Sequence, residues 1–216
     1  MDQPPPPWQP PNPAPISVRT PRLVLRAFGH ADAASLFEAI ESSRAALEPW
    51  ITWGKQGYRS LGETHDEIER LARLWDAKAF DPGIGYVVAI IDAGTGAVLG
   101  GTGLHRFDAA AHEGELGYWV RGDRHGQGIA SEAAAHMVSW AFAPQHEGGF
   151  GLRRVTAYAA DPNGASGRVL NKLGLACEGV RRAHRWVEGL GWTDTRCWAV
   201  LREEWDRERH RALTPA

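Results

Sequence analysis

Residues 113–142 decide the expected fold, and they read EGELGYWVRGDRHGQGIASEAAAHMVSWAF. Residues 115–120 form a short aromatic and β-branched run that is typical of a β-strand. The polar residues 121–124, with one glycine, predict a turn. A helix is predicted from there to residue 142, because apolar side chains recur on one side at helical spacing: Ile129, Ala133, Met137, Trp140 and Ala141.

The glycine turn between this strand and helix has the features of a phosphate-binding site. A helix N-terminus offers free backbone N–H groups and the positive end of the helix dipole. Gly126 and Gly128 have no Cβ, so a ligand can approach the backbone closely. The turn fits neither common nucleotide motif well. Ser131 stands where a dinucleotide fingerprint needs its third glycine, and the Gly-Lys-Ser/Thr of a P-loop is absent.

The composition indicates one globular domain with a core, or one domain with a tail, since 43% of the 216 residues are hydrophobic. The formal net charge of -2 gives no basic footprint for DNA or RNA. No apolar run is long enough to span a membrane, and the N-terminus shows no signal-peptide pattern. We therefore expect a soluble, cytoplasmic protein that binds neither nucleic acid nor membrane.

Metal and disulfide chemistry are not expected. Cys177 and Cys197 form neither a disulfide framework nor a zinc pattern. Four histidines are too irregularly spaced for a metal site: His112, His125, His136 and His146.

The other patterns predict an α/β domain built around one sheet. Strands are expected over residues 19–28, 85–91, 97–107, 115–120, 152–160, 175–187 and 192–201. Helices are expected over residues 33–40, from a cap at 64–67 to about 80, from the glycine turn to 142, and from a cap at 161–163 to 174. Residues 47–54 are expected to be irregular.

The two ends are expected to lie outside this domain. Residues 1–15 are rich in proline, which cannot form helix or ladder, so they predict a disordered or polyproline II tail. Residues 16–207 would form a single domain, and residues 208–216 a short C-terminal tail.

Four stretches together form a recognisable pattern: residues 20–26 (TPRLVLR), 115–119 with 126–130 (ELGYW and GQGIA), 163–174 (NGASGRVLNKLG), and Asp194 with Glu204-Trp205. In this order they resemble the GNAT N-acetyltransferases, most of all the RimJ/RimL-type branch, which acetylates protein N-termini and assorted amines. The resemblance spans residues 20–205. It implies a GNAT-like α/β fold whose mixed, mostly antiparallel sheet has about six to seven strands flanked by four helices.

The resemblance further implies transfer of acetyl from acetyl-CoA to a primary amine, by direct attack through a tetrahedral intermediate. The glycine turn would hold the CoA pyrophosphate through this segment: His125, Gly126, Gln127, Gly128, Ile129 and Ala130. His125 departs from the family, which often has Arg or Gln there, so the role of its side chain is left open. A backbone amide near Trp119 or Val120 would bind the thioester oxygen. Arg121 and Arg124 could add positive charge.

The catalytic candidates are Glu115, Ser166 and Asn163. Glu115 shares a strand face with Gly117 and Trp119 and would act as general base, its alternative being a structural ion pair. Ser166 and Asn163 would lie beside the leaving CoA sulfur, although Asn163 is also a plausible helix cap and Ser166 could bond to its own helix. Three residues are second-rank candidates: His105, His184 and Asp194. An acyl-cysteine route through Cys177 or Cys197 is disfavoured, because neither has a sequence-adjacent base.

The acceptor cannot be named from the sequence. Residues 47–80 and the last hairpin are expected to line its site, with four aromatic side chains: Trp50, Trp53, Trp186 and Trp192. A ribosomal protein N-terminus, an amino acid, a polyamine and an aminoglycoside all remain open, as does a homodimer formed through the last strands. The alternative function is an inactive CoA-binding sensor or scaffold of the same fold.

Overall fold

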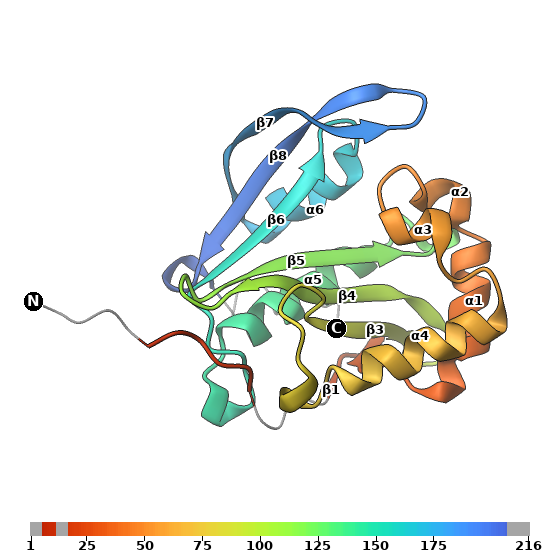
Figure 1. Cartoon of the computed structure of the whole chain (residues 1–216), viewed down its shortest axis with the longest axis horizontal. Coiled ribbons are helices and arrows are strands. Elements are labelled where there is room, and N and C mark those ends of the chain that lie inside the picture. Colours follow the sequence, from red (N-terminus) through yellow and green to blue (C-terminus); the bar gives the residue numbers. More distant parts are fainter. Residues whose placement is uncertain (1–5, 12–16, 207–216) are drawn as a thin grey trace, which may run out of the picture.

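An eight-stranded sheet runs through the described part of the chain, residues 6–11 and 17–206 of a computed structural model (Figure 1). The strands lie in the order β1-β2-β3-β4-β5-β6-β8-β7, and β5–β6 is the one parallel pair among the described residues. Their bounds are β1 Ser17–Arg19, β2 Leu23–Arg26, β3 Tyr86–Asp92, β4 Val98–Asp108, β5 Glu113–Val120, β6 Arg154–Ala160, β7 Ala176–Val187 and β8 Gly191–Leu201.

The prediction of six to seven strands was wrong by one strand, because the first predicted strand is a hairpin. Its turn is formed by Thr20, Pro21 and Arg22. The Thr20 hydroxyl accepts the N–H groups of Arg22 and Leu23 at 3.2 and 2.8 Å. A threonine side chain that bonds to the backbone two and three residues ahead favours a turn over a continuing strand. The predicted class, a mixed and mostly antiparallel α/β fold, is confirmed.

The helices cover both faces of the sheet (Figure 1). Helices α1 and α4 pack on one face, where Leu36 and Ile68 meet Ile91 of β3. On the other face lie α5 and α6, where Met137 packs with Leu116 of β5. Their bounds, with two short helices, are α1 Ala33–Glu41, α2 Arg44–Leu47, α3 Thr52–Gln56, α4 Leu61–Arg73, α5 Ile129–Phe142 and α6 Gly164–Leu173. The central strands of the sheet are therefore buried between two apolar helix layers.

The second predicted helix was displaced from its true position. Its cap is Ser60, whose hydroxyl accepts the Glu63 N–H at 3.1 Å, and not the predicted residues 64–67. It ends at Arg73 and does not continue to residue 80. Beyond it, Trp75 and Phe80 pack on Tyr86 of β3 with ring centroids 5.3 and 4.9 Å apart. This tertiary packing overrides the helical pattern.

The proline-rich segment is not a disordered tail over residues 6–11. Trp8 is buried against the sheet, where its ring stacks on Phe107 at a centroid distance of 4.7 Å. Its indole N–H donates to the Phe150 carbonyl at 2.6 Å, and its backbone N–H donates to the Ala109 carbonyl at 2.8 Å. A large aromatic surface with a satisfied N–H outweighs the cost of ordering a short segment. Residues 1–5 and 12–16 lie outside the described part.

The far end of the sheet is an open edge. Strand β7 pairs with β8 on one side and is exposed along almost its whole length. A homodimer through the last strands would use this edge and stays a prediction. The expected C-terminal tail lies outside the described residues. Within residues 6–11 and 17–206, no helix has the length and apolar character needed to cross a membrane.

Candidate functional site

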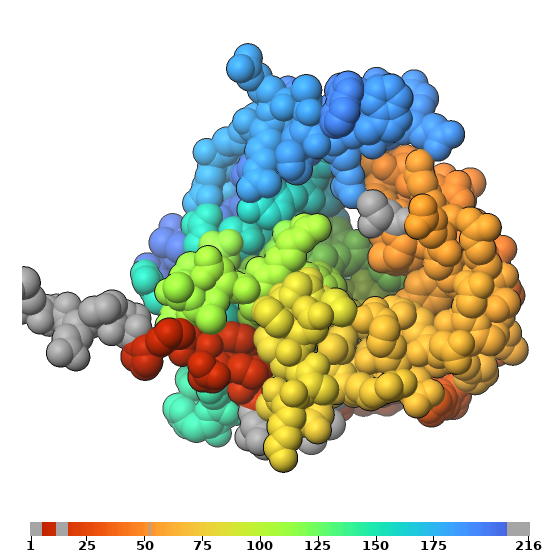
Figure 2. All heavy atoms as spheres, in the orientation of Figure 1, coloured from red at the N-terminus to blue at the C-terminus, as the bar shows by residue number. Residues whose placement is uncertain are grey.

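A cleft opens where β5 and β6 separate. The two strands pair in parallel over three residues, Glu113–Glu115 against Arg154–Thr156, and diverge beyond them (Figure 1). The resulting hollow has a volume of about 1620 Å³ and reaches from the glycine turn to the final hairpin. Figure 2 shows this face hollowed between the β7–β8 hairpin, in blue, and helices α2 and α3, in orange.

The separation exposes backbone groups of β5 to the cleft. Arg121, which follows β5, donates its N–H to the Leu99 carbonyl of β4 at 2.8 Å. Because alternate residues of a strand bond to the same neighbour, Tyr118 and Val120 direct their N–H and C=O groups away from β4. The ladder with β6 ends at Glu115, so these groups face the open side. Of the two amides expected to bind the thioester oxygen, that of Val120 is therefore exposed, whereas that of Trp119 faces β4 by the same alternation.

The glycine turn lies at one end of this cleft and opens α5. Gly126 and Gly128 adopt left-handed backbone conformations, with φ of 77° and 78°. A Cβ on Gly126 would meet no atom within 4 Å, so the turn leaves open space above its backbone. Gly128 is the N-cap of α5 and has no side chain to cap the first-turn amides. The turn therefore fits a pyrophosphate bound through backbone N–H groups.

An ion pair between Glu132 of α5 and Arg22 supports the glycine turn. Glu132, in the first turn of α5, is completely buried and accepts the Thr20 hydroxyl at 2.6 Å and the Arg22 Nε–H at 2.9 Å. Arg22 also donates from Nη1 to the Gln127 carbonyl at 3.0 Å. The β1–β2 hairpin thus fixes the turn. The sequence analysis missed this role. The one signal that could have found it is Glu132 itself, a lone carboxylate in a mostly apolar helix, since such a group needs a buried partner.

Replacing Arg22 by Met is expected to destabilise the chain by about 3 kcal/mol, because Glu132 then keeps a buried charge without its cation. The matched control is Arg19→Met on β1, whose exposed side chain makes one long bond of 3.4 Å to the Ala93 carbonyl. Urea unfolding measures both. The double variant Arg22→Met, Glu132→Met should recover much of the loss; equal stability of Arg22→Met and the control would contradict a clamp.

Two side chains of the turn, those of His125 and Arg121, bond to other groups of the protein. His125 Nε2 lies 2.8 Å from the Val120 carbonyl, which can only accept, so the ring donates there and ties the turn to β5. Arg121 donates to Glu38 and Asp123 at 2.8 and 2.6 Å and is therefore engaged elsewhere. Arg124 lines the cleft. The His125 side chain therefore has an observed structural role, which is to link the turn to β5.

On the far wall, α6 presents the predicted Asn163 and Ser166. The Asn163 side chain accepts the Ser166 N–H at 3.2 Å and caps the helix, as expected. The Ser166 hydroxyl lies 3.0 Å from the Tyr118 hydroxyl, which also donates to the Ser166 carbonyl at 3.1 Å. Burial raises the pKa of Tyr118 to about 12, so its phenol stays neutral. These bonds bridge the two walls, and the sequence analysis assigned Tyr118 no role of its own.

Glu115 lies in the cleft but is paired. Arg106 Nη1 donates to both of its carboxylate oxygens, at 2.9 and 2.8 Å. His105 stands directly opposite Glu115 on β4 and also lines the cleft. Its Nδ1 lies 2.7 Å from the Ile84 carbonyl. The structural alternative weighed for Glu115, an ion-paired strand residue, is therefore observed.

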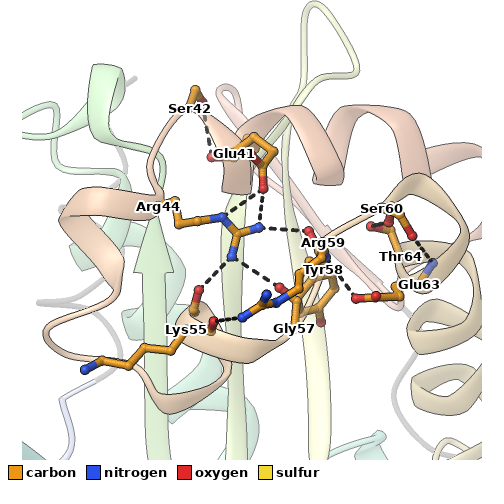
Figure 3. Close-up of polar contacts among 12 residues, drawn as sticks. Glu41, Ser42, Arg44, Lys55, Gly57, Tyr58, Arg59, Ser60, Glu63 and Thr64 are labelled. Carbon is orange, nitrogen blue, oxygen red and sulfur yellow. Dashed lines mark hydrogen bonds and ion pairs between the residues drawn. The ribbon is translucent and has the colours of Figure 1, made fainter.

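An aromatic wall closes the side of the cleft that faces α2 and α3. Trp53 packs edge-on against Trp119 at a centroid distance of 5.6 Å. Arg44 holds residues 54–58 at the end of α3 (Figure 3), and the stretch 47–54, predicted to be irregular, is partly helical in α2 and α3. Arg44 donates to the Gly54, Gly57 and Tyr58 carbonyls at 2.7, 3.2 and 2.8 Å and pairs with Glu41. The wall is therefore rigidly supported by one guanidinium.

The other expected acceptor residues are scattered. Trp50 lines the cleft, and Trp186 lines a recess beside it. Trp192 packs edge-on against Trp186 at a centroid distance of 5.8 Å, is 65% exposed, and lines neither the cleft nor the recess. A salt bridge of 2.9 Å between Lys55 and Glu188 joins the hairpin tip to α3.

Of the second-rank candidates, His184 lies in the cleft and Asp194 has a structural role. His184 lines the cleft and lies 3.1 Å from the Thr195 hydroxyl. Asp194 instead accepts the Ala183 N–H at 2.8 Å and shapes a bulge of β7. Neither cysteine lines the cleft. No group of three metal-ligating side chains occurs within the described ranges 6–11 and 17–206.

Comparison with known proteins identifies the architecture. The family model described as an acetyltransferase (GNAT) domain matches residues 22–176, which include the β5 strand, the glycine turn and α6. The chain belongs to the GNAT acetyltransferase family. The predicted family, fold class and enzyme class are thereby confirmed.

Relatives of this GNAT protein include N-acetyltransferases of bacteria. It is 26% identical over 185 residues to the uncharacterized N-acetyltransferase YoaA of Bacillus subtilis, covering 86% of this chain and 96% of YoaA. The ribosomal-protein-S5-alanine acetyltransferase of Vibrio fischeri has the same fold, with a TM-score of 0.75, 20% identity, and coverage of 88% and 99%. So does Mycobacterium smegmatis RimJ in complex with CoA-disulfide, with a TM-score of 0.72, 23% identity, and coverage of 94% and 96%.

Proposed function

We propose that this GNAT protein moves an acetyl group from acetyl-CoA to a primary amine by direct attack. The observation that carries the proposal is the opening of the sheet at β5 beside the glycine turn. It aligns a phosphate cradle, exposed strand amides and the N-terminus of α6 along one cleft. A long thioester with a pyrophosphate at one end matches this arrangement. No feature of the cleft within the described residues favours an acyl donor other than acetyl-CoA.

Each part of the cleft has a chemical task in this proposal. The amides from Gly126 to Ala130 bind the pyrophosphate. The N–H of Val120, or that of Tyr118 beside it, stabilises the oxyanion of the tetrahedral intermediate. The amine attacks as neutral NH2, which is readily available for a peptide α-amino group because its pKa is about 7.7–8.0. The wall formed by Trp50 and Trp53 faces the acceptor, and Trp186 extends it at the rim.

Ser166 protonates the departing CoA sulfur in this proposal, and the Tyr118 hydroxyl positions it. Ser166→Ala is expected to lower kcat by roughly 10- to 100-fold, because a thiolate without a proton donor leaves less readily. The dissociation constant for acetyl-CoA should stay within about twofold. Steady-state kinetics with calorimetry measure both quantities. Ser166→Thr keeps the hydroxyl and should restore most of kcat; equal losses in both variants would argue for a packing role.

An assay with a panel of amines would identify the acceptor. Peptides that begin with Ala, Ser or Met test the acceptor class named in the Vibrio fischeri relative. Spermidine, free lysine and an aminoglycoside test the small-molecule classes. Release of the CoA thiol in the presence of one class, with acetylation confirmed by mass spectrometry, would establish the enzyme and its acceptor. Binding of acetyl-CoA without turnover of any amine would instead support a CoA-binding sensor or scaffold.

A further inference from the structure

We propose that His105, and not Glu115, is the general base that takes the proton from the attacking amine. This inference rests on the acetyl transfer proposed above. It concerns a residue of β4 whose ring lines the same cleft as Ser166 and Trp119. The contacts of the ring determine which nitrogen carries the proton, which way the ring points, and which nitrogen can accept a proton.

The tautomer follows from one hydrogen bond. Nδ1 of His105 lies 2.7 Å from the Ile84 carbonyl, an atom that can only accept. Nδ1 must therefore carry the proton, and in the neutral ring Nε2 has a free lone pair. No described residue donates a hydrogen bond to Nε2. Backbone carbonyls that hold Nδ1–H are a common means of presenting the opposite nitrogen to a reaction partner.

Two glycines make room for the ring over β4 and β5. A Cβ on Gly117 would begin 3.0 Å from His105 Nε2, and a Cβ on Gly103 would begin 3.2 Å from it. Any side chain at Gly117 would therefore press against the ring. The base edge thus lies over β5 at Gly117, next to Tyr118, where the strand starts to leave β6. An acceptor that enters past Trp53 approaches a thioester in the opened sheet from this face.

The charges around the ring keep it neutral and ready. Burial lowers the pKa of His105 below its ordinary value, so the neutral ring predominates at pH 7. Glu115 pulls this pKa upward and Arg106 pulls it down, and these two groups are bound to each other. Other titratable and charged groups also line the cleft, among them Glu67, Arg70, Tyr58, Tyr118, Tyr158 and His184. Arg70 pairs with Glu67, as Arg106 does with Glu115.

Acetyl transfer with His105 as the base moves each proton between named groups. The amine nitrogen forms a bond to the thioester carbon, the carbonyl π electrons move to oxygen, and the nitrogen loses a proton to His105 Nε2. The oxyanion then collapses and the carbon–sulfur bond breaks. The sulfur leaves as a thiolate and takes a proton from Ser166, which regains one from water, and the imidazolium of His105 releases its proton to water. Both oxygens of the Glu115 carboxylate already accept from Arg106 Nη1, at 2.9 and 2.8 Å, so this group is engaged in an ion pair.

The test replaces His105 by Asn, whose side-chain amide can still donate to the Ile84 carbonyl while it offers no basic nitrogen. With the panel amine that the parent acetylates fastest, kcat/KM should fall on the order of 100-fold. The dissociation constant for acetyl-CoA should stay unchanged. In the parent, kcat/KM should fall at acidic pH, where the ring becomes protonated below the ordinary histidine pKa of about 6.5, and the variant should lose this dependence. The control His146→Asn changes a histidine that is 81% exposed and should behave as the parent.

Two results would overturn the assignment. One is a His105→Asn variant that turns over at the parent rate. The other is an acid limb that survives in His105→Asn and disappears in Glu115→Gln, which would return the role to the carboxylate. A parent chain that binds acetyl-CoA and acetylates no amine contradicts the proposed function itself, and is told apart from both results by the absence of any parental rate.

Discussion

Gly128→Asp is expected to weaken acetyl-CoA binding by about 100-fold or more, equivalent to about 2.8 kcal/mol. Gly128 is the N-cap of α5, so an added carboxylate would put a negative charge at the helix end that binds the pyrophosphate, and its Cβ would lie 3.7 Å from Nη2 of Arg22, which holds the turn. Two like charges about 4 Å apart near a protein surface repel by several kcal/mol. Calorimetric titration of the variant measures the loss.

The matched control for this variant is Gly96→Asp. Gly96 has a φ of 75°, almost equal to the 78° of Gly128, and lies in the β3–β4 turn, where a Cβ meets no atom within 4 Å. The control therefore imposes the same backbone strain and the same charge away from the cleft. It should bind acetyl-CoA as the parent does. A Gly128→Asp variant with parental affinity would refute the assignment of the turn.

Trp8→Ala is expected to lower the free energy of unfolding by about 3–5 kcal/mol, the usual cost of truncating a buried Trp. Trp8 is 6% exposed and fills a cluster with Phe80 and Phe107. Its loss also leaves the Phe150 carbonyl without the indole donor. For a chain of this length the midpoint of thermal unfolding should fall by roughly 6–20 °C.

An exposed tryptophan provides the comparison. Trp186 is 60% exposed on the final hairpin, so Trp186→Ala should cost less than about 1 kcal/mol. Denaturant and thermal unfolding of the three chains give both differences. If the two tryptophan variants were equally stable, the segment 6–11 would contribute nothing to the fold, and the expectation of a tail separate from the domain would be right in energetic terms.

The central stretch could be predicted because its signals are local. The aromatic strand, the two glycines and the helix from residue 129 each follow from periodicity or from the conformational freedom of glycine. They appear as β5, the glycine turn and α5. The cap formed by Asn163 and the stop at Gly174 were local for the same reason. The family resemblance added the order in which these elements form one cleft.

The misses arose from contacts between residues far apart in the chain. Trp8 is separated from Phe150 by 142 positions, and Thr20 from Glu132 by 112. No periodicity reports such a pair. The choice between Glu115 and His105 also depends on strand register, which places the two side by side and brings Arg106 onto the carboxylate. Sequence spacing alone favoured the carboxylate because it lies on the central strand.

The most direct test of the central claim, that the opened sheet and the glycine turn bind acetyl-CoA, is a calorimetric titration of the parent chain. We predict saturable binding of one acetyl-CoA per chain. S-acetylpantetheine, which carries the thioester without the pyrophosphate, should bind at least about tenfold more weakly, since it lacks the charge-assisted bonds to the turn. Absence of acetyl-CoA binding, or equal affinity for the two thioesters, would contradict the account.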